Sequence, residues 1–254
     1  MAKKENLLFL ILGGFFITNA LVAEFIGVKI FSLEGTFGWE NINWSLFGIE
    51  GTLQFSAGVL PWPVVFIMTD IINEYYGQKG VKILTYLTAG LIGYAFILIF
   101  MSIFLEPADW WLASFQEQGV DNAQNAFAGI YGQGMWIIIG SLVAFLTGQL
   151  LDAVIFHRLR KVTGKNIGLR ATISTLVSQL FDSFIVLYIG FILPGKMTLS
   201  QFFAIGAVNY SYKVLAAIVL IPILYLVHRW IRNYLGEERA ESLIRNAANN
   251  QLAA

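Results

Sequence analysis

The chain has 254 residues, of which 57% are hydrophobic and only 13% are charged. This composition excludes an ordinary soluble domain and is typical of a membrane protein with several spanning helices. The 16 basic and 16 acidic residues cancel, so net charge favours no class of partner. The absence of cysteine excludes disulfides and thiolate metal sites, and only His157 and His228 could supply imidazole ligands. We therefore expect no metal ion and no cofactor.

Long apolar runs predict six membrane-spanning helices, each near the roughly 20 residues needed to cross a bilayer. We place them at residues 7–30, 55–76, 81–104, 135–156, 169–193 and 201–227. Residues 31–54 and 105–134 form the two longer loops. The alternation between Trp39 and Trp44 predicts a small hairpin in the first of them. We expect a kink at Pro61-Trp62-Pro63, because two prolines remove two backbone donors from the helix.

The distribution of basic residues predicts the orientation of these helices. Thirteen of the 16 Lys and Arg residues fall on the side of the two termini. Lys29 and Lys196 fall on the opposite side, and Lys213 lies within a span. Because cytoplasmic loops are enriched in Lys and Arg, both termini are expected in the cytoplasm.

The expected fold is thus an all-α membrane protein with six transmembrane helices and cytoplasmic N and C termini. Residues 1–227 would form the transmembrane transport domain, and residues 228–254 a cytoplasmic helical tail. Three spans in each half of the domain would allow an inverted 3+3 repeat.

The stretch Thr69–Gly77 places two carboxylates at the end of an apolar run. In a helix, Asp70, Asn73 and Glu74 share one face, because they are spaced at i, i+3 and i+4. A charged side chain at membrane depth costs roughly 2.5–3.5 kcal/mol. This face is therefore expected to point into protein or into a water-filled cavity rather than into lipid.

Further polar residues interrupt the other predicted spans. They are Asn19, Glu24, Gln149, Asp152, Ser178, Gln179, Asp182, Asn209 and Lys213. Glu74 and Asp152 could be shallow enough to reach cytoplasmic water, and one acid could simply neutralise Lys213. The remaining carboxylates are functional candidates, because ionisable groups inside membranes are rarely structural alone. The predicted spans contain more carboxylates than cations, and they also contain several amides. Such a set of groups suits a flat, neutral or cationic solute that carries many hydrogen-bond donors. A guanine-like base, a vitamin and an amine all fit that description.

A stripe of small residues marks the fourth predicted helix. Gly140, Ala144 and Gly148 recur at four-residue spacing. Such stripes allow close packing of helices in membranes. The stripe therefore predicts tight helix packing, and it also leaves room for a homodimer.

The segment Thr69–Gly77 resembles the signature of the queuosine precursor transporter family, which was formerly described as a vitamin uptake group. Thr18-Asn19-Ala20, the segment Ser178–Ser183, and Asn209-Tyr210 with Lys213 resemble further motifs of this family. The resemblance covers residues 7–227 and departs from the family in the two longer loops. It implies uptake of 7-cyano- or 7-aminomethyl-7-deazaguanine, or a related base or nucleoside, through a central polar cavity in the bacterial inner membrane.

Combined with the buried polar residues, this resemblance predicts a set of site residues. The substrate-binding candidates are Asn19, Asp70, Glu74, Gln179, Asp182, Asn209 and Lys213. The candidates for a supporting or coupling role are Glu24, Asn73, Gln149, Asp152 and Ser178. The carboxylates would accept the N–H groups of a 7-deazapurine, and the amides and the lysine would meet its carbonyl or ring nitrogens. The expected partners are this small molecule and the lipid bilayer, with no nucleic acid.

Two other interpretations fit the sequence to different degrees. A substrate-binding membrane subunit that needs a separate energising module also fits six helices and a small size. An intramembrane aspartyl protease does not fit, because the chain has no Gly-x-Gly-Asp pattern, no His-Glu-x-x-His pattern and no Ser/His pair at membrane depth. We therefore expect a protein that is not an enzyme. Proton coupling and facilitated diffusion are both compatible with the sequence.

Overall fold

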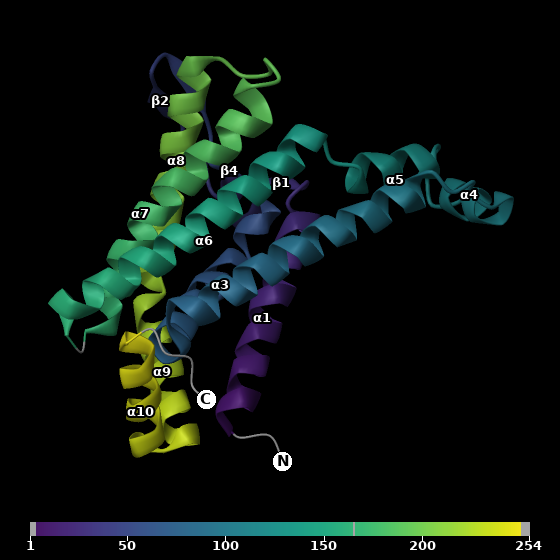
Figure 1. The fold of residues 1–254 in the computed structure, drawn as a ribbon. Helices are drawn as coiled ribbons and strands as arrows, with labels where there is room; N and C mark the ends of the chain where they lie inside the picture. The colour runs from purple at the N-terminus through teal and green to yellow at the C-terminus, as the bar shows by residue number, and fades with distance from the viewer. Residues whose placement is uncertain (1–3, 165, 250–254) are drawn as a thin grey trace.

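The computed structural model describes residues 4–164 and 166–249. The helices of these residues are α1 (Lys4–Ile26), α2 (Leu33–Phe37), α3 (Trp62–Ile103), α4 (Asp109–Gln116), α5 (Ala123–Tyr131), α6 (Met135–Thr163), α7 (Ile167–Leu187), α8 (Leu199–Val219), α9 (Ile221–Leu235) and α10 (Glu237–Ala248) (Figure 1). A 3-10 turn, η1 (Ala57–Val59), precedes α3, and a π-helical segment, η2 (Tyr188–Ile192), extends α7. The short strands are β1 (Ile30–Ser32), β2 (Trp44–Leu46), β3 (Ile49–Gly51) and β4 (Gln54–Ser56).

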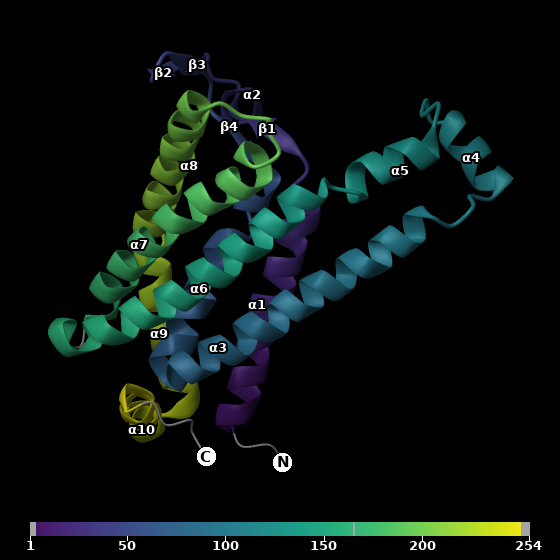
Figure 2. The same cartoon turned by 45° about the horizontal axis from the view of Figure 1, so that its top comes forward.

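In the described residues, five helical stretches are long and apolar enough to cross a membrane. One of them, Ala57–Ile103, contains a break at Gly77, where φ is +68° and ψ is −175°. Only glycine adopts this backbone conformation readily. The break divides α3 into two segments that run in different directions (Figure 2). The fold is therefore that of an all-α membrane protein, as the composition predicts.

The predicted start of the second span is wrong. Residues 54–56 form β4, η1 follows, and α3 begins only at Trp62. Pro63 occupies the first turn of α3, where backbone N–H groups have no partner within the helix. The prolines therefore start the helix instead of kinking it.

The last predicted span, residues 201–227, is interrupted. α8 ends at Val219, and α9 begins at Ile221 with Pro222 in its first turn. The boundary drawn at residue 227 consequently falls inside α9, which continues to Leu235. A proline starts the new helix here too, for the same reason as at Pro63.

The C-terminal helix α10 packs back onto the bend in α3. Ala240, Leu243 and Ala247 form its buried face. A Cβ atom added to Gly77 would lie only 3.0 Å from the carbonyl oxygen of Ala247. The bend and α10 are thus in close contact, and they lie at the same end of the molecule as the start of α1 (Figures 1 and 2).

The strands lie at the opposite end of the molecule (Figure 1). β2 pairs with β3 across a turn in which Phe47 and Gly48 both have positive φ, and β1 pairs with β4. The hairpin predicted at Trp39–Trp44 is therefore displaced along the chain, because the two-residue turn forms where glycine permits positive φ. The second long loop folds into α4 and α5, which project away from the other helices (Figure 2).

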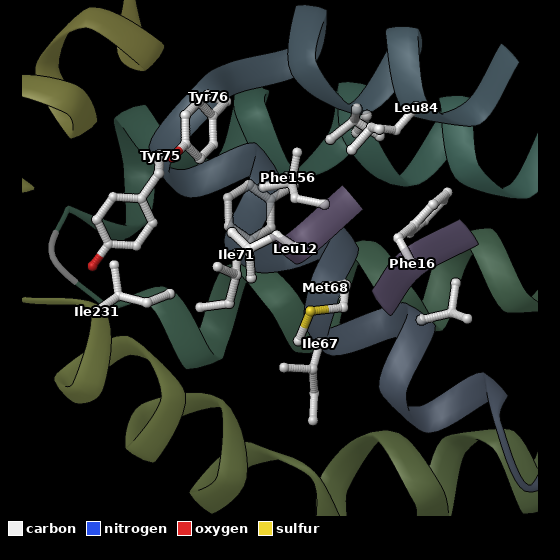
Figure 3. Packing of buried hydrophobic residues seen from close by; sticks show 14 of the residues in the cluster. Leu12, Phe16, Ile67, Met68, Ile71, Tyr75, Tyr76, Leu84, Phe156 and Ile231 are labelled. Carbon is white, nitrogen blue, oxygen red and sulfur yellow. The ribbon is translucent and has the colours of Figure 1, made fainter. Parts of the chain in front are cut away.

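The first half of α3 lies at the centre of the hydrophobic core. Figure 3 shows its Ile71 close to Leu12 of α1 and Phe156 of α6. The small-residue stripe of α6 packs against α7 and η2, since a Cβ on Gly140 would lie 3.1 Å from the backbone nitrogen of Gly190. The predicted use of the stripe in close helix packing is confirmed. Because α3 is central, its polar side chains face α6 and α7 rather than lipid.

Candidate functional site

The polar face of α3 is buried against α6. Thr69 Oγ1 lies 2.8 Å from Gln149 Oε1 and donates to it. Asn73 Nδ2 donates to the backbone oxygen of Ala153 at 3.0 Å. Asp70 and Asn73 lie on one face of α3, as their helical spacing predicts, and this face points into protein.

Glu74 lies at the centre of a buried charge cluster, which we call the Glu74 cluster. Its Oε2 atom accepts from Arg170 Nη2 at 2.5 Å and from Arg160 Nη2 at 2.9 Å. Arg160 also donates to the backbone oxygens of Asn73, Glu74 and Ile244. The cluster thereby ties α3 near its bend, the end of α6 and the start of α7 to α10.

The two arginines of this cluster were not expected from the sequence. Both belong to the thirteen Lys and Arg residues expected on the side of the termini, and Lys213 is the one cation that the sequence predicts within a span. In the structure Arg170 is only 2% exposed. Both arginines bind the carboxylate of Glu74 in this conformation, and its predicted direct contact with substrate stays a prediction.

Two small cavities adjoin the polar face of α3. The Asp70 cavity lies between α3, α7, α8 and α9 and has about 290 Å³ of unfilled space, counting the part that is open outward. Apart from Asp70 and two threonines, its walls are apolar. The Asp152 cavity lies between α3, α6 and α7 and has about 190 Å³. Its walls are mainly polar and comprise Phe66, Thr69, Gly148, Gln149, Asp152, Thr175, Ser178 and Gln179.

Each cavity contains a buried carboxylate with a free acceptor atom. Asp70 is 5% exposed, Asp152 is 6% exposed, and neither forms an ion pair with another described residue. Asp152 Oδ1 accepts long hydrogen bonds from Thr175 and Ser178 at 3.4 and 3.3 Å. Asp70 Oδ1 and Asp152 Oδ2 have no donor among the described residues. Such atoms are rare, because a buried acceptor without a donor is costly.

Asp182 and Lys213 form an ion pair between α7 and α8. One acid therefore does neutralise Lys213, as the sequence allowed. The pair is partly exposed, and Asp182 Oδ1 lies 3.7 Å from the position of a Cβ on Gly148, which lines the Asp152 cavity. Asp182 and Lys213 are thus neighbours of that cavity, although they do not line it.

The remaining predicted residues lie elsewhere. Asn19 Nδ2 donates to the backbone oxygen of Phe15 in its own helix. Asn209 is half-buried on α8, and neither asparagine lines a cavity. Glu24 accepts from the Ser141 hydroxyl at 2.8 Å and is anchored to α6.

The structure thus gathers one part of the predicted set around the two cavities: Asp70, Gln149, Asp152, Ser178 and Gln179. Phe66 and Thr175 line both cavities, and neither was expected from the sequence. An apolar aromatic residue in an apolar run gives no sequence signal of such a position. A single threonine on a helix is equally uninformative.

Comparisons with known proteins identify the family. Residues 56–227 match the model of the family described as "Putative vitamin uptake transporter". A "Probable queuosine precursor transporter" from Bacillus subtilis is 30% identical over 193 residues, which cover 74% of this chain and 76% of that protein. The "Queuosine precursor transporter" of Escherichia coli is 27% identical over 172 residues, covering 66% and 70%.

A "Probable queuosine precursor transporter" from Haemophilus influenzae is 23% identical over 167 residues, covering 64% of this chain and 63% of that protein. No solved structure shows a significant match. The matched residues include α3 to α8 and the walls of both cavities, whereas α1 and α10 lie outside the match. The chain belongs to the queuosine precursor transporter family, a family of multi-pass membrane transporters rather than enzymes.

Proposed function

We propose that this protein imports queuosine precursors across the bacterial inner membrane. The substrates are 7-cyano- or 7-aminomethyl-7-deazaguanine, or a related base or nucleoside. The names of the curated relatives support the substrate class. The composition of the two cavities supports a small, flat and donor-rich molecule.

The observation that carries this proposal is the pair of free carboxylate oxygens, Asp70 Oδ1 and Asp152 Oδ2. A deazaguanine ring carries several N–H donors on one edge. A carboxylate that accepts such donors forms charge-assisted hydrogen bonds, which are about twice as strong as neutral ones. Substrate binding would therefore satisfy the acceptors that the protein itself leaves without donors.

The geometry suggests a division of roles among the candidate residues. Asp70 and Asp152 accept the N–H groups of the substrate. Gln149 and Gln179 each offer both a donor and an acceptor to the ring carbonyl and ring nitrogens. Ser178 orients Asp152 through the hydrogen bond described above.

The other candidates contribute differently in this proposal. Asp182 and Lys213 act as an ion pair beside the Asp152 cavity. A substrate contact by Glu74 requires both of its ion pairs to open. Contacts by Asn19 and Asn209 require α1 and α8 to move. Such movements between helices belong to the alternating access of membrane transporters.

We further propose six membrane crossings, with the two segments of α3 counted separately on either side of Gly77. The thirteen Lys and Arg residues on the side of the termini support a cytoplasmic location for both ends. In this orientation the Glu74 cluster and α10 close the cytoplasmic end of the transport domain, residues 1–227. The inverted 3+3 repeat and a homodimer are hypotheses within the same topology.

The test is uptake by the purified protein in proteoliposomes. We expect accumulation of labelled 7-aminomethyl- or 7-cyano-7-deazaguanine, competition by the unlabelled compound, and no competition by thiamine. Asp70→Ala and Asp182→Ala should each abolish uptake while the folded protein stays in the membrane. Unchanged uptake in both variants would refute the assigned site.

The same preparation separates the mechanisms that the sequence leaves open. Uptake that rises with an imposed inward proton gradient indicates proton coupling, and indifference to the gradient excludes it. Binding of the labelled base without any transport would favour a substrate-binding subunit that needs an energising module. No binding of either deazaguanine would reject the substrate class.

A further inference from the structure

The Asp70 and Asp152 cavities share part of their walls. Phe66 of α3 and Thr175 of α7 line both of them. The other residues around the Asp70 cavity are mainly apolar, whereas those around the Asp152 cavity are mainly polar. The shared wall therefore separates an apolar space beside Asp70 from a polar space beside Asp152.

We infer that the two cavities are the halves of one substrate chamber, which Phe66 closes in this conformation. When the substrate enters, the phenyl ring of Phe66 turns aside and becomes the surface on which the flat heterocycle stacks. Phe66 is then both a partition and a positioning residue. This inference rests on the proposed function for the identity of the ligand, but the division of the chamber is a property of the chain alone.

The position of Phe66 in the fold supports this role. It lies one turn after Trp62, the first residue of α3, and the two rings are nearly parallel with centroids 6.0 Å apart. Asp70 follows one turn later on the same helix. Phe66 thus shares the wall of one cavity with Asp70 and the wall of the other with mainly polar residues.

The walls on the two sides of Phe66 differ in chemistry. The Asp152 cavity offers hydroxyl, amide and carboxylate groups, which suit the hydrogen-bonding edge of a heterocycle. The Asp70 cavity is apolar around a single carboxylate. An aromatic ring between them can stack on a flat base, an interaction worth roughly 1–3 kcal/mol per base. Neither half alone supplies both the polar edge and the apolar face that such a molecule requires.

The first experiment measures binding of 7-aminomethyl-7-deazaguanine to the purified full-length protein by isothermal titration calorimetry. Loss of stacking in Phe66→Leu should weaken binding about tenfold or more. Phe66→Tyr keeps the ring and should bind within about threefold of the wild type. Binding by Phe66→Leu that equals the wild type would overturn the stacking role.

Phe145 provides the matched control. It is a buried aromatic of α6, 2% exposed, and its ring centroid also lies 6.0 Å from that of Trp62, but it lines neither cavity. Phe145→Leu should leave the affinity unchanged in the folded protein. An equal loss in both leucine variants would mean that Phe66 acts only through packing, and the inference would fail.

The second experiment needs no substrate, and it uses the absence of cysteine from the chain. Ser178→Cys places one thiol in the Asp152 cavity, and a water-soluble methanethiosulfonate reagent reports its accessibility. Removing the partition with Phe66→Ala should raise the modification rate severalfold, whereas Phe145→Ala should not. Equal rates in the two backgrounds would contradict a divided chamber. A failure of all deazaguanine binding would instead reject the proposed substrate.

Discussion

Two carboxylates of α3, one turn apart, differ sharply in their surroundings. Asp70 and Glu74 are both almost fully buried, at 5% and 3% exposed. Glu74 is held by Arg160 and Arg170, whereas Asp70 Oδ1 has no donor among the described residues and adjoins a cavity. Both side chains end in a carboxylate and both are buried, so neither chemistry nor burial separates the two roles. The bonding partners of the two carboxylates do separate them.

The comparison distinguishes stabilising charges from ligand-binding ones. Breaking a buried ion pair costs roughly 3–5 kcal/mol because one charge is left uncompensated. A buried acid without a cationic partner destabilises the folded protein, because its desolvation is not compensated. Such acids in membrane proteins therefore mark functional sites. We therefore expect the Glu74 cluster to govern stability and the two free acids to govern affinity.

The largest effect should follow removal of Arg170. Arg170→Ala leaves Glu74 with one of its two cationic partners and should lower the free energy of unfolding by about 3 kcal/mol. Thermal unfolding in detergent measures this loss. An Arg170→Ala protein as stable as the wild type would mean that the cluster does not hold the helices.

The next largest effect should follow neutralisation of Asp152. Asp152→Asn keeps the shape of the side chain but replaces a charged acceptor, which contributes about 1.5–3 kcal/mol to a hydrogen bond. The affinity for 7-aminomethyl-7-deazaguanine should therefore fall about ten- to hundredfold. The midpoint of thermal unfolding should not decrease, because no ion pair is lost. Full affinity in this variant would remove Asp152 from the site.

A smaller effect is expected at the bend that joins α3 to α10. Gly77→Ala forces a Cβ into a backbone with φ of +68° and within 3.0 Å of the Ala247 carbonyl oxygen. Positive φ at a non-glycine residue costs roughly 1–3 kcal/mol. Unfolding should occur at a lower temperature, with substrate affinity retained.

Gly90 is the matched control for this substitution. It lies in the second segment of α3, and a Cβ there would meet nothing within 4 Å. Gly90→Ala should be neutral or slightly stabilising, since alanine has the higher helix propensity. If Gly77→Ala behaved like Gly90→Ala, the contact between α10 and the bend would not contribute to stability.

The smallest effect concerns another buried acid, Glu34, near the strands. Its carboxylate accepts from the backbone N–H of Leu53 at 2.7 Å and from the hydroxyl of Ser32. The hydrogen bond from Leu53 is the largest of the causes that lower the pKa of Glu34 below its usual 4.5. Because the folded pKa is depressed, its stabilisation is present above pH 4.5 and is lost as pH falls through the folded pKa.

Thermal unfolding between about pH 3 and pH 7 measures this dependence. These limits lie on either side of the usual carboxyl pKa of about 4. The wild type should lose more stability below pH 4.5 than Glu34→Gln does. Substrate affinity at neutral pH should be the same in both proteins. Identical pH profiles would show that protonation of Glu34 has no effect on stability.

The sequence predicted the parts of the fold that depend on hydrophobic pattern. The apolar runs located the long helices, and the small-residue stripe located the close packing of α6. Helix ends were less predictable. Pro63 and Pro222 lie in the first turns of α3 and α9, but the apolar pattern continues on both sides of each proline and does not mark the helix start. The pattern reports burial, whereas a helix start depends on which backbone N–H groups need partners.

The candidate site was predictable only in part. Helical spacing correctly placed Asp70 and Asn73 on a face directed into protein. It could not distinguish Glu74 from Asp70, because the arginines that bind Glu74 come from helices far along the chain. Phe66 was equally hidden, since its position between two cavities depends on the packing of α3 against α7.

The central claim is tested most directly by measuring both properties on the same two variants. For Asp70→Asn, the account predicts at least about tenfold weaker binding of 7-aminomethyl-7-deazaguanine with an unfolding temperature no lower than that of the wild type. For Glu74→Gln, it predicts a lower unfolding temperature with unchanged affinity of the folded protein. Weaker binding by Glu74→Gln together with normal binding by Asp70→Asn would contradict the account.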